Sequence, residues 1–142
     1  MARKHPKKTG GTFLMLPHYV LRHKLFGTLA GNSVKLFIEL AKEYNGSNNG
    51  DLSATFSTLK QRGFKSKGTL DRALKELMDK GFIQKTRQGS KNKCSLYGLS
   101  FHRLDECDGK MDVNPTKAAS MLWKQNDIAT PIQLTTAPDE GQ

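Results

Sequence analysis

Residues 64–100 read FKSKGTLDRALKELMDKGFIQKTRQGSKNKCSLYGLS, and this stretch decides the fold. Its first half has apolar residues at helical spacing, begins near Ser66, which can cap a helix, and ends at Gly81, which can terminate one. Its second half has two runs of strand-forming residues on either side of the turn sequence GSKN, which is typical of a β-hairpin. We therefore expect a helix over residues 66–80, followed by a hairpin whose loop covers about residues 86–94.

The residues before this stretch predict two more helices. Residues 52–63 favour a strand of two or three residues and then a short helix that ends at Gly63, because glycine tolerates the left-handed conformation found at helix ends. The next helix restarts within three or four residues, which is the spacing of a helix-turn-helix. Farther upstream, a core helix is expected between a cap at Asn32 or Ser33 and a stop at Asn45-Gly46. Its inward stripe is expected to hold Val34, Phe37, Ile38 and Ala41, widened by Leu36 and Leu40.

These elements follow one another in the order of a winged helix-turn-helix, a mainly α fold with a small β-hairpin, of class α+β. We expect this domain to cover residues 12–104, with an extended entry and a short helix that starts near Pro17. Residues 1–11 are expected to form a disordered basic arm, because their composition buries little apolar surface. Residues 105–142 are expected to form an acidic, largely irregular tail with one short helix near residues 118–125.

The charge of the chain is uneven. The 142 residues carry a net charge of +10. Up to residue 104 there are 20 Lys and Arg against 6 Asp and Glu, a net charge of +14, whereas residues 105–142 have 3 against 7, a net charge of −4. A basic domain of this size favours a polyanion as its partner, because neutralising phosphates releases condensed counterions.

A helical wheel places the cations of the helix over residues 66–80. Its inward side is predicted to hold Leu70, Ala73, Leu74, Leu77 and Met78, and its outward side Gly68, Arg72, Lys75 and Asp79. In helix-turn-helix docking, the outward residues near the helix N-terminus enter the major groove, where Arg72 suits a guanine edge. The hairpin is predicted to hold the phosphate backbone or a minor groove. The predicted DNA-binding residues are Gln61, Arg62, Lys65, Ser66, Lys67, Gly68, Thr69, Arg72, Lys75, Lys85, Arg87, Ser90, Lys91, Asn92 and Lys93.

The sequence gives little support to catalysis, to a metal site or to a membrane span. The two cysteines and four histidines lack metal-ligand spacing, and no catalytic serine elbow, phosphate-binding glycine loop or HExxH motif is present. The longest apolar runs are too short to cross a bilayer. We therefore expect a cytoplasmic protein that is not an enzyme, has no cofactor and no membrane partner, and binds double-stranded DNA.

Several segments give the chain a resemblance to a known group of proteins. These are LPHYVL, ELAKEYNGSNNGDLS, SKGTLDRALKELMDKGFI, KTRQGSKNKCSLYGLSF and CDGKMDVNPT. Together they resemble small winged helix-turn-helix proteins of proteobacterial prophages and integrative elements, whose function is largely unassigned, and more distantly the winged-helix domains of plasmid replication initiators. The resemblance covers about residues 11–117. It implies a DNA-binding accessory protein of a mobile genetic element, associated with the nucleoid when bound, and supplies no catalytic residues.

Within this fold the role stays open at the level of sequence. The leading hypothesis is a transcriptional regulator. The alternative is a replication or partition accessory protein that binds an origin and recruits a protein partner through residues 105–142, with Trp123 in the docking segment. A protein-interaction domain without nucleic acid fits the charge poorly, and RNA binding is disfavoured because the A-form major groove does not admit a recognition helix. A homodimer would match two half-sites, but no heptad pattern provides an interface.

Overall fold

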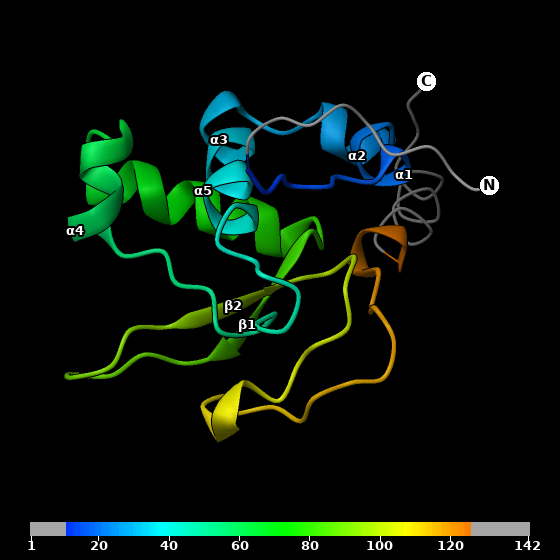
Figure 1. The fold of residues 1–142 in the computed structure, drawn as a ribbon. Coiled ribbons are helices and arrows are strands. Elements are labelled where there is room, and N and C mark those ends of the chain that lie inside the picture. Colours follow the sequence, from blue (N-terminus) through cyan, green and yellow to red (C-terminus); the bar gives the residue numbers. More distant parts are fainter. Residues whose placement is uncertain (1–10, 126–142) are drawn as a thin grey trace, which may run out of the picture.

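The computed structural model describes residues 11–125, and Figure 1 shows the fold. The predicted basic arm, except Gly11, and residues 126–142 of the predicted tail lie outside the described residues. The helices are α1 (His18–Leu21), α2 (Lys24–Gly27), α3 (Gly31–Ala41), α4 (Phe56–Leu59) with its 3-10 extension η1 (Lys60–Arg62), and α5 (Lys67–Asp79). The strands β1 (Ile83–Arg87) and β2 (Leu96–Leu99) follow, and then the 3-10 turn η2 (Cys107–Gly109). Helices and a two-stranded antiparallel hairpin agree with the predicted α+β class.

The start of α3 differs from the prediction. The helix begins at Gly31 after Ala30 as N-cap, which provides no side-chain cap, so the expected cap at Asn32 or Ser33 was wrong. Glu76 of α5 takes over this task, because its Oε1 accepts hydrogen bonds from the backbone N–H of Ala30 at 3.1 Å and from Ser33 Oγ at 2.5 Å. A carboxylate at a helix N-terminus also interacts favourably with the helix dipole. The helix ends at Ala41, four residues before the expected stop.

The inward face of α3 is rotated relative to the prediction. Leu36, Phe37 and Leu40 are almost completely buried, as expected, but Ile38 is 36% exposed and Val34 only partly buried. The buried positions 33, 36, 37, 40 and 41 form their own i, i+3, i+4, i+7, i+8 stripe, which faces α5. Ser33, at the start of this stripe, hydrogen-bonds to Glu76 of α5.

The sequence predicted α4 and α5 more closely. Gly63 ends η1 with φ of +101°, and Ser66 caps α5 by accepting a hydrogen bond from the N–H of Thr69 at 3.1 Å. The inward residues Leu70, Ala73, Leu74 and Leu77 are buried, and Met78 packs at the edge of the core. Gly81 follows the helix with φ of +88°, and a Cβ there would lie 2.6 Å from the backbone N of Trp123. Both the turn and the close approach therefore require glycine.

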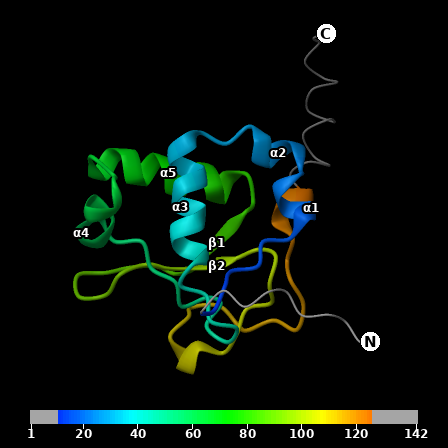
Figure 2. The ribbon, with the colours of Figure 1, turned by 45° about the horizontal axis from the view of Figure 1, so that its top comes forward.

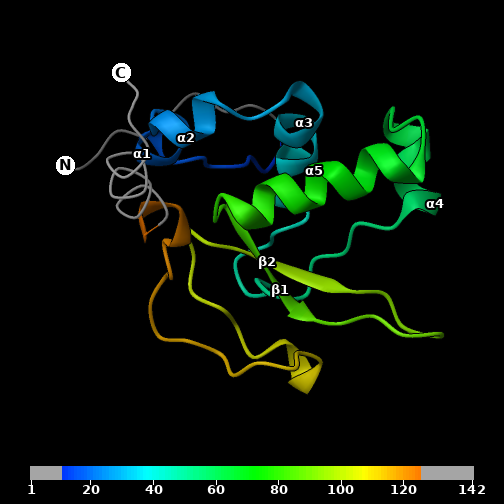
Figure 3. The same cartoon turned by 180° about the vertical axis from the view of Figure 1, so that it is seen from behind.

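The hairpin pairs Ile83 with Leu99 and Lys85 with Tyr97, with an irregularity between Lys85 and Arg87. Figure 3 shows α5 lying across it. The strand expected near residue 52 is reduced to a single bridge, in which Leu52 and Tyr97 exchange backbone hydrogen bonds of 3.2 and 2.7 Å.

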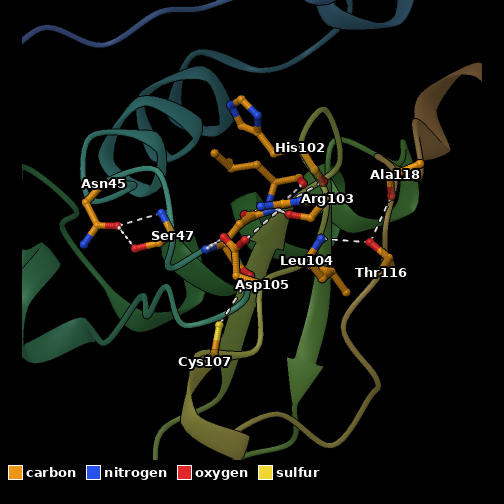
Figure 4. A network of polar contacts seen from close by, with 11 residues as sticks. Asn45, Ser47, His102, Arg103, Leu104, Asp105, Cys107, Thr116 and Ala118 are labelled. Atoms are coloured by element: carbon orange, nitrogen blue, oxygen red, sulfur yellow. Dashed lines mark hydrogen bonds and ion pairs between the residues drawn. The ribbon is translucent and has the colours of Figure 1, made fainter.

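Residues 105–125 are largely irregular, as expected, but they pack against the hairpin. Thr116 and Leu104 exchange two hydrogen bonds of 2.9 and 3.0 Å, and Thr116 Oγ1 also donates to Ala118 O at 2.9 Å (Figure 4). The N–H of Asp112 donates to Thr86 O at 2.7 Å. A helical turn begins at residue 122, within the predicted range. The packed unit therefore continues past residue 104 to residue 125.

Trp123 belongs to the core. It is fully buried, stacks on Phe82 with ring centroids 5.8 Å apart, and stacks on Tyr19 at 6.3 Å. Phe82 also meets Phe26 and Phe37 edge-on, at 5.5 and 6.3 Å. Trp123 is therefore not available for the docking role that the recruiter hypothesis gave it.

Candidate nucleic-acid interface

The outward side of α5 presents the residues expected there. Gly68, Arg72, Lys75 and Asp79 are all exposed. Arg72 lies along the helix, with Nη2 3.4 Å from Thr69 Oγ1, and Lys75 Nζ pairs with Asp79 Oδ2 at 2.8 Å. A Cβ at Gly68 would lie 3.4 Å from Arg72 Nη1, so the glycine leaves room for the guanidinium beside the first turn.

The N-terminus of α5 is open to solvent. Ser66, Lys67 and Gly68 are exposed, and the N–H groups of Lys67 and Gly68 have no acceptor within residues 11–125. Lys67 Nζ lies 3.3 Å from Asp71 Oδ2 one turn later. Free N–H groups and the helix dipole suit an anion such as a phosphate.

The turn before α5 supplies a second group of cations. Gln61, Arg62 and Lys65 are exposed. Arg62 is held by Glu39 of α3, whose side chain is 9% exposed: Arg62 Nε lies 3.2 Å from each carboxylate oxygen. Lys42 Nζ binds the same carboxylate at 3.2 Å. Burial by itself would raise the pKa of Glu39, but the hydrogen bonds from Arg62 and Lys42 outweigh it, and the pKa lies below its ordinary value.

Lys35 joins this surface although the sequence did not single it out. It is exposed on α3, its Nζ lies 5.8 Å from the ring centroid of Phe64, and its end occupies the space where a side chain at Gly63 would stand. Only the packing of α3 against the turn brings it there. Nothing in its local sequence distinguishes it from an ordinary solvated lysine.

The hairpin residues divide into two sets. Lys91, Asn92 and Lys93 are exposed at the tip, where Ser90 and Lys93 form an isolated bridge, and the amines of Lys91 and Lys93 have no partner within the described chain. Arg87 instead braces the hairpin, because Nε and Nη2 both donate to Cys94 O, at 3.2 and 2.8 Å.

A groove of about 570 Å³ lies between α5 and the hairpin, beside the cations described above. Lys67, Lys85, Ser90 and Lys93 line it, over an apolar floor that includes Leu70. Lys85 Nζ is hydrogen-bonded to Gln88 Oε1 at 3.0 Å on its rim. The structure thus brings Lys67, Lys85 and Lys93 together around one groove, which Asp71 also lines, whereas Arg72 and Lys75 form a separate ridge on α5.

Tyr44 and Tyr97 do not provide an exposed stacking surface for bases. Tyr97 is buried, and Tyr44 is partly buried against His102, with ring centroids 4.4 Å apart. Burial lowers the pKa of His102, opposed by Asp105. Residues 11–125 contain no group of three or more His, Cys, Asp or Glu side chains placed to hold a metal ion. No helix in this range is long and apolar enough to cross a bilayer.

Comparison with known proteins adds no relative: no protein-family model, curated protein or solved structure matches the chain significantly.

Proposed function

We propose that this protein binds double-stranded DNA as a winged helix-turn-helix, with α5 in the major groove and the hairpin on the adjacent backbone or minor groove. In this role α4, η1 and the Gly63 turn form the first part of the helix-turn-helix. The resemblance to prophage and integrative-element proteins supports a transcriptional regulator of a mobile element. A dimer on two half-sites is part of the same proposal.

The observation that carries the proposal is the concentration of cations on these elements. Residues 60–93 contain eleven Lys and Arg and only three Asp and Glu. One of the three, Glu76, is turned inward to α3, where it binds Ser33 and Lys80. The exposed acids Asp71 and Asp79 each sit beside one lysine. The remaining excess of positive charge faces solvent around one groove and one helix ridge.

The existing ion pairs of this surface are weak enough to exchange for phosphate. Exposed pairs such as Lys67–Asp71 and Lys75–Asp79 contribute about 0–1 kcal/mol each. Exchanging the carboxylate partner of a lysine for a DNA phosphate therefore costs little free energy. The exchange also releases counterions from the DNA, which favours binding through their entropy. Arg72, with its planar fork and only a long contact to Thr69, is the best candidate for reading a base edge.

Fluorescence anisotropy with a labelled duplex at several salt concentrations tests the proposal. If about five phosphates are neutralised, the slope of log K against log salt should be about −4 to −5. Selection of bound sites from a random duplex pool should then return a motif, and a palindrome would indicate two copies. No binding at low salt, or a flat salt response, would overturn the proposal.

The recruiter alternative has less support than regulation. Its expected docking residue, Trp123, lies in the core, stacked on both Tyr19 and Phe82. A recruiting role would have to use other residues of the segment 105–142.

A further inference from the structure

The exposed apolar side chains are concentrated in one short segment near the start of the described chain. The described residues expose seven large hydrophobic side chains, and five of them fall between residues 13 and 21: Phe13, Leu14, Met15, Tyr19 and Leu21. Phe13 and Met15 are 67% and 72% exposed and lie two residues apart on non-helical backbone, whereas Leu16 packs against the core. Phe13, Leu14 and Met15 line one groove, and exposed apolar side chains grouped in this way mark a contact site.

A groove of about 600 Å³ lies beside the same segment. Residues 12–15 form one side, and Lys42 and residues 43–46 at the end of α3 form the other, with the His102 ring at its edge. The surface is therefore hollowed as well as apolar, which suits an extended peptide rather than a flat protein face.

The described chain ends next to this surface. Trp123 stacks on Tyr19, and Lys124 Nζ lies 5.8 Å from the centroid of the Tyr19 ring. Figure 2 shows the turn at residues 122–125 side by side with α1, at the end of the domain opposite the hairpin tip. Tyr19 follows Phe13 by six positions, a span of at most about 20 Å. Residues 126–142 reach more than twice as far when extended.

The two segments have opposite charge. Residues 13–24 contain Arg22 and Lys24 and no Asp or Glu, and the groove adds Lys42 together with Glu43. Residues 126–142 contain no Lys or Arg, and their acidic and large aliphatic residues are Asp127, Asp139, Glu140, Ile128, Ile132 and Leu134. The segment that leaves the domain beside Tyr19 thus offers both apolar and charge complementarity to the surface next to it.

We infer that residues 126–142 dock on the surface formed by residues 13–21 and the adjoining groove, as an intramolecular cover. Ile128, Ile132 and Leu134 supply apolar contacts for Phe13 and Met15. The short tether gives the segment a high effective concentration, so weak contacts suffice. The cover shields an apolar surface that otherwise favours self-association. This inference goes beyond DNA binding and does not depend on it.

Photo-crosslinking in the full chain tests the inference. Phe13 is replaced by the photoreactive p-benzoylphenylalanine, the protein is irradiated at low concentration, and the products are mapped by mass spectrometry. The matched control carries the same residue at Val113, an exposed apolar position in the loop after η2. We expect intramolecular crosslinks from position 13 to residues 126–142, several-fold more abundant than from position 113. The triple variant D127N/D139N/E140Q should reduce their yield, as should high salt.

Each other result overturns the inference. Covalent dimers linked through position 13 would assign the surface to a second copy of the chain. Crosslinks from position 13 only to residues 11–125, or equal yields from positions 13 and 113, would show that residues 126–142 do not occupy the surface. A further variant combines D127N/D139N/E140Q with I132S/L134S. If its crosslink yield from position 13 equalled that of the otherwise unchanged chain, neither charge nor apolar contacts would hold residues 126–142 on the surface.

Discussion

Arg62 donates to both carboxylate oxygens of Glu39 through Nε, at 3.2 Å each, and its Nη2 lies 3.1 Å from Oε2, so the turn before α5 is fastened to α3 by one bidentate pair. Because the pKa of Glu39 is lowered in the folded state, the pair stabilises the fold above the ordinary carboxyl pKa. This stability is lost as the pH falls through the folded-state pKa. We expect E39Q to reduce the free energy of unfolding at pH 7 by about 1 kcal/mol, since Arg62 is half exposed.

Urea denaturation of wild type and E39Q, at pH 7 and again below pH 4, measures this effect. The difference between the two proteins should shrink at the lower pH, because protonated Glu39 resembles glutamine. Equal stability at pH 7, or a difference that grows on acidification, would contradict the role given to the pair.

The outward ridge of α5 predicts two different effects on DNA binding. R72A should weaken binding to a selected site by about 1–3 kcal/mol and relax the preference at one base position, because the proposed bidentate contact to a base would carry sequence information. K75A should weaken binding to all sequences alike and reduce the salt slope by about one. Anisotropy with selected and scrambled duplexes separates the two. If both variants lose affinity uniformly, α5 does not read bases.

We expect the lysines of the hairpin tip to contribute to DNA affinity independently of the DNA sequence. K91A/K93A should lower the affinity for any duplex and reduce the salt slope by about two, because these amines have no partner within residues 11–125. K117A provides a control with a charge change in the irregular segment, where Lys117 is exposed. If K117A lost as much affinity for each charge removed as K91A/K93A does, net charge rather than the hairpin would set the affinity.

The elements that the sequence predicted well are those whose signals are local. The start and end of α5 depend on Ser66 and Gly81, and both are close in sequence to what they terminate. The start of α3 was missed because its N-cap contact comes from Glu76, 43 residues after Ser33. Lys35 was missed for the same reason. Trp123 follows the short apolar run Met121-Leu122 in an otherwise irregular segment, so its burial depends on distant contacts such as Phe82 and Tyr19, which no local pattern encodes.

Asn49 is buried, and we expect a large loss of stability when its amide nitrogen is replaced by an oxygen in N49D. Its Oδ1 accepts from the N–H of Leu99 at 2.7 Å, and its Nδ2 donates to the carbonyls of Leu99, His102 and Arg103 at 3.0, 3.2 and 2.8 Å. N49D would place a carboxylate oxygen against three carbonyl oxygens, so we expect it to cost at least about 3 kcal/mol, more than N49A. Thermal and urea denaturation at pH 7 measure both. N49D as stable as N49A would show that the amide donors contribute little.

Trp123 distinguishes a core role from a docking role. W123A would remove the ring between Phe82 and Tyr19 and leave a cavity, so we expect a loss of about 3–5 kcal/mol in the free energy of unfolding, and a smaller loss for W123F. Circular dichroism during urea denaturation measures both variants, because Trp123 is the single tryptophan and its fluorescence is lost with it. A docking residue would leave the stability of the isolated protein unchanged. If W123A lost less than about 1 kcal/mol in the free energy of unfolding, Trp123 would not be a core residue, and the recruiter hypothesis would be supported again.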